Sequence, residues 1–351
     1  MACRASGRQR CGTCCCPTTI GRVSETMELL DKQSYHIGHL PAQATSAVAG
    51  RVLADIADTD DRIVVFTADL KYSNGTLEFE ERHPDRFFNV GIAEQNMVSM
   101  AAGMAATGNI AYVATFASFL GLLCCEQIRT DAAYTNLPVR LLGHHTGISF
   151  GYYGSSHHAT EDIGIMRGIA NLGVVCPCDA HSFEQALRQT VDVEGPIYFR
   201  LGRGRDPDVY TPDMPWEYGK LSVLREGKDG LVIANGIMVV AAMEASERLS
   251  KEGLDLSVVD LHTIDPLDVD NLASQVASAN KVFVAEEHST RGGVATTVAD
   301  TMVDHNIADV ELIRIGFPAD EYSEIAAPFY LYRHYGLDAD GLVSRISSEY
   351  K

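Results

Sequence analysis

The sequence lacks the features of several specialised protein classes. No apolar run approaches the ~18 residues that a membrane-spanning helix needs, so we expect no membrane segment. Basic residues are scarce, because 28 lysines and arginines face 47 aspartates and glutamates, for a formal net charge of −19. This acidity argues against nucleic acid and anionic membranes as partners. It does not exclude an anionic small substrate, since a few arginines or histidines can invert the field inside a cleft.

Cysteine is concentrated in one short segment at the start of the chain. Cys11 and Cys14 have the spacing of metal ligands, but no second pair with histidine follows nearby, so we expect no zinc site. The segment also lacks the apolar core of a secretory signal. We therefore expect residues 1–34 to be a disordered, cysteine-rich leader. A hydrophobic content of 46% and a charged content of 21% then predict an ordinary soluble protein of the cytoplasm.

The pattern after residue 34 predicts two α/β domains. Apolar runs without polar alternation, such as 62–67 and 138–143, alternate with helical segments such as 118–134. This is typical of parallel sheets that helices cover on both faces. The stretch 202–219 contains three prolines and little apolar periodicity, so it predicts a linker. The expected organisation is a first domain at 35–204, a linker at 205–228 and a second domain at 229–351.

Glu94 is a candidate catalytic acid. It lies in F-N-V-G-I-A-E-Q-N at 88–96, between a short predicted strand and a helix indicated by the spacing of Met97, Met100 and Met104. Apolar surroundings favour the neutral form of a carboxyl group, and a proton relay at neutral pH needs such a group. The alternative is a glutamate that only complements the positive end of its helix.

Several motifs, in order along the chain, resemble one enzyme family. The first domain resembles the pyrimidine-binding domain of transketolases at 88–97, in T-F-A-S-F at 115–119 and in E-Q-I-R-T-D-A-A-Y-T-N-L-P at 126–138. The second domain resembles the family's C-terminal domain in A-N-G-I-M-V, L-H-T-I-D-P-L-D and E-E-H-S-T-R-G-G, at 234–239, 261–268 and 286–293. The whole resembles the separately encoded C-terminal half of bacterial split, two-component transketolases. The fold implied is a pair of mostly parallel, three-layer α/β domains.

The resemblance implies thiamine diphosphate chemistry. In this family the aminopyrimidine of the cofactor removes a proton from its thiazolium carbon, and a carboxyl group on the pyrimidine nitrogen promotes the tautomer that does so. Glu94 matches that carboxyl group. Phe119 matches the aromatic residue that stacks on the aminopyrimidine, and Phe116 lies one helical turn earlier on the same face. Plain core packing is the alternative for both rings, and it is the stronger alternative for Phe116.

A glycine-rich loop supplies candidate substrate ligands. G-H-H-T-G-I-S-F-G-Y-Y-G-S-S-H-H at 143–158 follows a predicted strand end, where α/β proteins place their ligands. His145 and His157 match two substrate-facing histidines of the family, which donate hydrogen bonds and move protons. Imidazole suits both tasks because its ordinary pKa is near neutrality. His144 and His158 are weaker candidates, for which a structural role is the leading interpretation.

Two further residues match phosphate ligands of the family. Arg203, in R-L-G-R-G, matches an arginine that grips a substrate phosphate, and a guanidinium fork suits that anion. Ser73, in A-D-L-K-Y-S-N, matches a serine on the same phosphate. Isolated arginines and serines are common on surfaces, so an ordinary surface role is the alternative for each.

The sequence departs from the family pattern in three respects. Tyr152 and Tyr153 stand where ordinary transketolases have an acidic pair that helps to select sugar stereochemistry, so Tyr153 becomes a candidate substrate contact. Ser46 replaces an expected phosphate-binding arginine, and Leu122 replaces a tyrosine. These changes suggest an altered acceptor, for example one without a sugar phosphate. The donor, the acceptor and the pathway stay open.

The sequence contains no G-D-G segment, with which the family binds the metal that holds the cofactor's diphosphate. Magnesium prefers oxygen ligands together with phosphate, so we expect no metal ligands in this chain. The resemblance then implies an N-terminal-type transketolase subunit as partner, which carries the diphosphate-binding domain and Mg²⁺. An α2β2 heterotetramer is the expected assembly.

Three functions are compatible with these motifs. The first is the pyrimidine-side subunit of a two-component transketolase-like enzyme that transfers a two-carbon ketol unit from a ketose to an aldehyde or a modified acceptor. The second is the β-type subunit of a 2-oxo acid dehydrogenase decarboxylase component, which shares this domain pair. The third is a non-catalytic, stabilising partner of a thiamine diphosphate enzyme. His145 and His157 favour ketol transfer, and Glu94 with Phe119 argues against a non-catalytic role.

Overall fold

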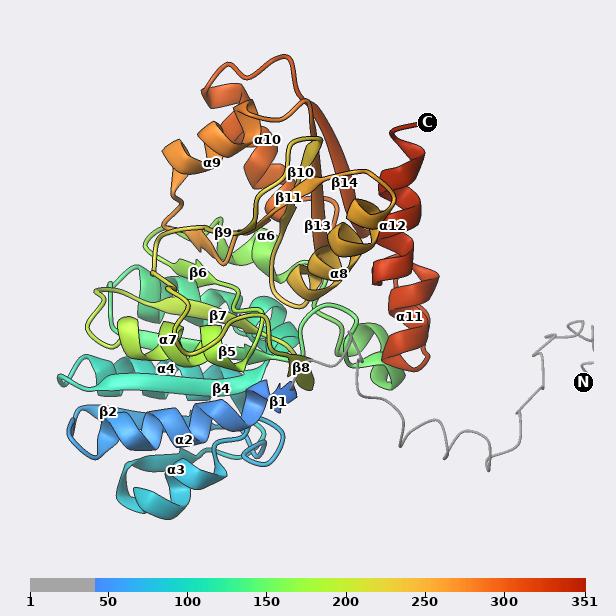
Figure 1. Ribbon diagram of the computed structural model, residues 1–351. Helices are drawn as coiled ribbons and strands as arrows, with labels where there is room; N and C mark the ends of the chain where they lie inside the picture. Colours follow the sequence, from blue (N-terminus) through green and yellow to red (C-terminus); the bar gives the residue numbers. More distant parts are fainter. Residues whose placement is uncertain (1–41) are drawn as a thin grey trace, which may run out of the picture. The chain divides into compact units, whose positions relative to one another are not determined.

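Two mostly parallel sheets with helices on their faces make up the protein, in a computed structural model that describes residues 42–351 (Figure 1). This arrangement confirms the predicted fold of two α/β domains. The cysteine-rich leader predicted at 1–34 and the first residues of the predicted first domain lie outside the described residues.

The first sheet has seven strands, six of them parallel. Its central strands are buried along their whole length, as expected for apolar runs covered on both faces. In spatial order the strands are β12 (Thr263–Asp265), β6 (Gly173–Val175), β7 (Ile197–Leu201), β5 (Val139–His144), β4 (Ile110–Phe116), β2 (Ile63–Thr67) and β3 (Phe87–Asn89).

Helices pack on both faces of this sheet. One core cluster joins it to α2 (Thr45–Ala57) and α7 (Ala180–Gln189), and a second joins its other face to α4 (Glu94–Ala105) and α6 (Asp162–Met166). The helix predicted over 118–134 is present but irregular. It comprises α5 (Cys125–Gln127) between the π-helical turns Phe119–Leu123 and Ile128–Ala133. A further short helix, α3 (Leu77–Arg82), follows β2.

The second sheet has four parallel strands and an antiparallel edge strand. The order is β14 (Glu311–Phe317), β13 (Lys281–Ser289), β10 (Gly230–Ala234), β11 (Leu256–Asp260) and β9 (Ser222–Arg225). One face packs on α8 (Met238–Lys251), α11 (Pro328–His334) and α12 (Ala339–Ser348), and the other on α9 (Val269–Ala277) and α10 (Val294–Asp304).

The segment predicted as an extended linker is packed against both domains. Its first residues form β8 (Arg205–Pro207), which pairs with β1 (Ala42–Ala44), and β9 joins the second sheet. Tyr210 and Trp216 are buried, and the Tyr210 hydroxyl donates to Asp260 at 2.9 Å. These aromatic side chains bury apolar area that a solvated linker would leave in water. No helix within 42–351 is long and apolar enough to cross a membrane.

Candidate active site

The candidate site lies at the carboxyl edge of the first sheet. Phe116 is the last residue of β4, not part of a helical turn shared with Phe119 as expected. It pairs with His144 at the end of β5, and His144 pairs with Leu201 at the end of β7. The segments that follow these three strands therefore start from one edge. They contain Phe119, the glycine-rich loop and Arg203, so the fold brings together motifs that are far apart in sequence. Ligands of open parallel sheets bind at such an edge.

The rings at this edge form an aromatic–histidine cluster of Phe116, Phe119, His145, Phe150, Tyr153 and His157. Phe150 is central: its ring centroid lies 4.7 Å from that of His145, 5.0 Å from that of His157 and 4.4 Å from that of Tyr153. Phe119 is 5.3 Å from His157, and Phe116 is 4.9 Å from His145. Sequence reasoning missed Phe150. Its only signal is a single phenylalanine in a loop of glycines, serines and histidines.

His145 is held in an unusual state. Its backbone has φ 63°, a left-handed conformation that a non-glycine residue rarely adopts. The side chain is 7% exposed, and its Nδ1 has no hydrogen-bond partner among the described residues. Burial is the main cause that lowers the pKa of His145 to about 2, and its interactions with His144, Arg203 and His157 act in the same direction. The imidazole is therefore neutral at pH 7, with one nitrogen able to donate and the other to accept.

The other three histidines of the loop are also shifted towards the neutral form. His157 is partly exposed, burial lowers its pKa, and its Nδ1 lies 2.9 Å from Ser156 Oγ. Burial lowers the pKa of His144 to about 3, and burial is also the main cause that lowers the pKa of His158. Neither ring nitrogen of His144 has a partner within the described part of the chain. Because these imidazoles are neutral, positive charge beside the cluster comes from arginine.

Arg203 borders the cluster. The carbon of its guanidinium group lies 5.2 Å from the centroid of Phe150, and Nη1 donates to the carbonyl of Ser149 at 3.3 Å. Tyr152 and Tyr153 are 47% and 59% exposed, so their phenols lie at the solvent side of the cluster. Arg203 thus leaves most of its donors available to an anion while the ring beneath it fixes its position.

Glu94 is the first residue of α4 and is only 6% exposed. Within residues 42–351, no hydrogen bond or ion pair reaches its carboxylate. Glu94 lies near Cys124. Burial, and then the charge of Glu94, raise the pKa of that thiol to about 12. A buried carboxyl group without a protein partner, and a partly exposed ring at Phe119, fit the two contacts that an aminopyrimidine requires.

Three other positions named from the sequence are not among the rings of the cluster. Ser73 is exposed between β2 and α3, and none of the described residues joins it to the cluster through a hydrogen bond. Ser46 lies at the start of α2. Leu122 is 55% exposed in the turn Phe119–Leu123. The structure thus gives Ser73 no fixed partner.

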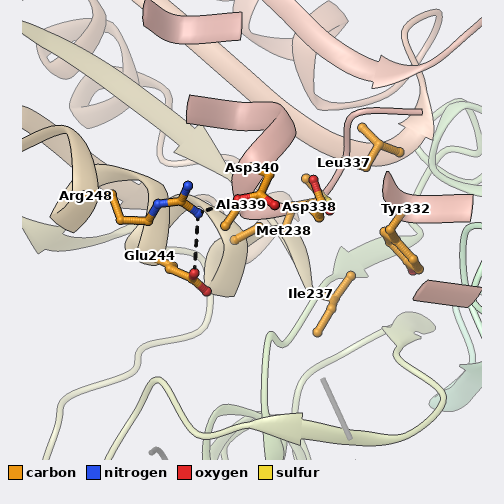
Figure 2. Close-up of a pocket in the computed structure, with 10 residues that line it drawn as sticks. Ile237, Met238, Glu244, Arg248, Tyr332, Leu337, Asp338, Ala339 and Asp340 are labelled. Atoms are coloured by element: carbon orange, nitrogen blue, oxygen red, sulfur yellow. Dashed lines mark ion pairs between the residues drawn. The ribbon is translucent and has the colours of Figure 1, made fainter. Parts of the chain in front are cut away.

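A separate pocket of about 170 Å³ lies in the second domain, between the start of α8 and α11–α12 (Figure 2). Its charged groups are paired with one another: Arg248 contacts Glu244 at 3.6 Å and Asp340 at 2.8 Å. Asp338 accepts the backbone N–H of Gly341 and caps α12. Because each of these charged side chains already has a partner in the protein, we assign no ligand to this pocket.

No metal site is evident in the described part of the chain, where no group of three or more histidine, cysteine, aspartate or glutamate side chains could hold an ion. The spacing of Cys11 and Cys14 lies outside the described residues. The expectation that Mg²⁺ binds to a partner subunit stays a prediction.

Comparison with known proteins agrees with this geometry. Residues 42–207 match the pyrimidine binding domain of transketolase, and residues 219–342 match the transketolase C-terminal domain. The chain is 33% identical to one of the subunits of apulose-4-phosphate transketolase from Actinobacillus succinogenes, over 80% of this chain and 90% of the relative. It is 34% identical to the 6-deoxy-6-sulfo-D-fructose transketolase subunit SqwH of a Clostridium species, over 83% and 90%.

A solved structure, described as a split gene transketolase in an inactive β4 tetramer, superposes with a TM-score of 0.78 at 35% identity. The superposition covers 88% of this chain and 98% of that one. Two matched domains in one order, a cluster of the expected rings and histidines, and relatives that are separate subunits lead to one conclusion. The chain belongs to the transketolase family and contains its pyrimidine binding domain followed by its C-terminal domain.

Proposed function

We propose that this chain is the pyrimidine-side subunit of an enzyme that transfers a two-carbon ketol unit from a ketose to an aldehyde or a modified acceptor. The observation that supports this most directly is the aromatic–histidine cluster. It presents two imidazoles, neutral by burial, beside a partly exposed Phe119 at the carboxyl edge of the sheet. A 2-oxo acid decarboxylase subunit has less use for two such histidines, so ketol transfer is the better explanation.

Thiamine diphosphate, when bound, supplies the nucleophilic carbon that holds the two-carbon unit. Glu94 holds a proton at the pyrimidine ring nitrogen, and its buried site without a protein partner supports this role. Phe119, supported by Phe116, stacks on the pyrimidine and excludes water. His145 and His157 donate hydrogen bonds to hydroxyl or carbonyl oxygens of the substrate and move protons as the carbon–carbon bond breaks and forms.

The proposed enzyme needs a second subunit. The diphosphate and its Mg²⁺ would bind to an N-terminal-type transketolase chain, in a cytoplasmic α2β2 heterotetramer. The similar split-gene structure is described as an inactive assembly of four β chains, which supports this requirement.

The acceptor is proposed to have an anionic group that Arg203 binds, with Ser73 as a second contact. The two relatives are named for a sugar phosphate and a sulfo sugar, both of which are anionic. The exposed phenol of Tyr153 stands where a carboxylate is usual, and it would line the acceptor's path. We propose that Tyr152, Tyr153 and Ser46 change which acceptor is used, so that ordinary pentose phosphates are not the preferred substrates.

Reconstitution tests the proposal. The full chain is purified together with the neighbouring subunit that contains the diphosphate domain, and thiamine diphosphate and Mg²⁺ are added. Ketose donors are then screened against aldehydes, with products lengthened by two carbons as the expected result. Full activity of the isolated chain, or turnover of 2-oxo acids instead of ketoses, would contradict it.

A further inference from the structure

The glycine-rich loop closes on itself at a narrow base. Gly147 N–H donates to the carbonyl of Ala159 at 3.0 Å, and Ala159 N–H donates to the carbonyl of Gly147 at 2.9 Å. His145 lies two residues before one side of this base, and His157 lies two residues before the other. Whatever fixes the base therefore fixes the starting points of both imidazoles.

A buried ion pair between the two domains holds both sides of the base. Arg200 on β7 donates from Nη1 to Glu287 Oε1 on β13 at 2.7 Å, with side-chain exposures of 1% and 2%. Glu287 Oε1 also accepts from Thr146 Oγ1 at 2.7 Å, next to Gly147. Arg200 Nη2 donates to the carbonyl of Ala159 at 3.3 Å. One side of the loop thus depends on the carboxylate and the other on the guanidinium group.

Further contacts fix the ion pair itself. Asp162 Oδ2 accepts from Arg200 Nε at 2.9 Å and from the Tyr198 hydroxyl at 2.8 Å. The hydroxyl of Tyr332 on α11 donates to Glu287 Oε2. At Gly147 there is no room for a side chain, because a Cβ atom would overlap the Glu287 carboxylate. Burying such charges is costly unless geometry and hydrogen bonds are satisfied, and here they are.

His145 is the residue that most needs support. Its left-handed backbone persists only if the surroundings hold it. The next residue, Thr146, is fixed from two directions. Its N–H donates to the carbonyl of Leu201 at 3.3 Å, and its hydroxyl lies 2.7 Å from Glu287 Oε1 and 3.2 Å from the same Leu201 carbonyl.

We propose that Glu287, a residue of the C-terminal domain, positions His145 through Thr146 and positions His157 through Arg200 and Ala159. The catalytic part of this statement rests on the proposed function, whereas the geometric part does not. Glu287 touches no reacting atom. The C-terminal domain then supports the histidine loop of the neighbouring domain, in addition to contributing to the hydrophobic core.

The decisive variants change Thr146. In the reconstituted complex, with the donor and acceptor found in the screen, Thr146→Val should lower kcat about tenfold to a hundredfold, because small misplacements of catalytic groups have effects of this size. KM should change less than kcat. Thr146→Ser keeps the hydroxyl and should restore most of the rate. Glu287→Gln should have an effect at least as large. A smaller loss of kcat is expected for Tyr332→Phe. This change removes the hydroxyl that donates to Glu287 but keeps the ring that lines the pocket (Figure 2).

Glu286→Gln is the matched control. Glu286 is equally buried on the same strand but accepts the N–H groups of Val294 and Ala295, away from the loop. It should leave kcat unchanged at temperatures where the protein is folded. Equal kcat losses in Glu286→Gln and Glu287→Gln would overturn the proposal, as would a Thr146→Val variant with the wild-type kcat.

A structural readout separates this inference from the proposed function. Crystal structures and histidine ring NMR spectra of the full chain are compared for wild type, Thr146→Val and Thr146→Ser. We expect φ of residue 145 and the His145 ring signals to change in the valine variant only. Unchanged geometry in all three would refute the positioning role even if the complex is active. If the valine variant shows the altered geometry but the wild-type complex transfers no ketol unit, only the proposed function would be refuted.

Discussion

The carboxyl ends of two buried strands, β5 and β13, both have buried polar side chains. The two ends differ in whether these side chains have hydrogen-bond partners. β5 ends in His144, which His145 follows, and β13 contains Glu286, Glu287 and His288 near its end. On β13 every one of these side chains has partners. Glu286 accepts two N–H groups at the start of α10, Glu287 bonds to Arg200, Thr146 and Tyr332, and His288 Nε2 accepts from Gly164 N–H at 3.2 Å.

On β5 the partners are missing from the described residues. Both nitrogens of His144 and Nδ1 of His145 are buried without one. An unsatisfied buried polar group is costly, so it persists where something outside the chain, such as substrate or a partner subunit, completes it. We therefore expect the first edge to bind a ligand and the second edge to support the first.

Two buried carboxyl groups give the strongest test of this contrast. Glu94, without a partner among the described residues, is compared with Glu286, which caps α10. We expect Glu94→Gln to lower kcat of the reconstituted complex about 10²–10⁴-fold, the usual effect of removing a proton-transfer group. It should leave the free energy of unfolding nearly unchanged. Glu286→Gln should do the reverse and cost about 1–2 kcal/mol of stability, since one helix N–H group loses its acceptor.

Steady-state kinetics and chemical denaturation of both variants provide the measurement. If Glu94→Gln were active, or were the less stable of the two, Glu94 would only complement its helix, and the contrast between the two edges would fail.

The same comparison applies to two histidines. His145→Phe keeps a ring against Phe116 and Phe150 and loses no protein hydrogen bond of Nδ1. We expect a loss of about a hundredfold in kcat with little change in stability. His288→Phe leaves the N–H of Gly164 and the carbonyl of Ser289 unpaired, at a cost of about 1–3 kcal/mol of stability. Kinetics and thermal unfolding measure both effects, and equal losses of stability would contradict the distinction.

The strands were predictable from the sequence, and their arrangement was not. Runs such as 62–67 and 138–143 are apolar without alternation, which is the local mark of a central parallel strand, and β2 and β5 lie there. The strand β12 pairs with β6 of the first sheet although it follows β11 in sequence, and no local pattern encodes such a pairing. The linker was predicted from three prolines and little apolar periodicity, whereas Tyr210 and Trp216 within it are buried.

The candidate site divides in the same way. A loop with four histidines and a match to a family motif indicated His145 and His157, because residue type and spacing are local properties. Local patterns could not indicate Phe150 or the partners of Glu287. Thr146 and Glu287, for example, are 141 residues apart in sequence. The roles assigned to individual residues, and the domain limits at 35–204 and 229–351, stay predictions.

Substrate binding extends the comparison to two arginines, Arg203 and Arg200. The guanidinium of Arg203 lies over Phe150 and donates to the Ser149 carbonyl, whereas Arg200 is fully engaged in the ion pairs of the supporting edge. We expect Arg203→Gln to raise KM for an anionic acceptor about tenfold or more, since a hydrogen bond to a charged group contributes about 1.5–3 kcal/mol. KM for an uncharged acceptor is the control. Equal increases for both acceptors would show that Arg203 does not read the charge.

The pH dependence of stability compares two buried histidines, one with hydrogen-bond partners and one without. Burial lowers the pKa of both His144 and His262 to about 3, but His262 lies 3.0 Å from Thr263 Oγ1 and 3.3 Å from Ser222 Oγ. Because each binds its proton more readily in the unfolded chain, stability is complete above the ordinary pKa near 6.5 and is lost as the pH falls towards 3. Replacing either histidine by phenylalanine should reduce that loss by about 1.4 kcal/mol per pH unit between pH 6 and pH 4.

The difference between each phenylalanine variant and wild type isolates its histidine. Groups common to both proteins, such as Asp206, whose pKa burial raises to about 7, cancel in that difference. Urea denaturation at several pH values measures the slopes. At pH 7 only His262→Phe should be less stable than wild type, because only it breaks hydrogen bonds. A His144→Phe variant with the wild-type slope would mean that this imidazole finds a proton-stabilising partner in solution, and the end of β5 would no longer count as unpartnered.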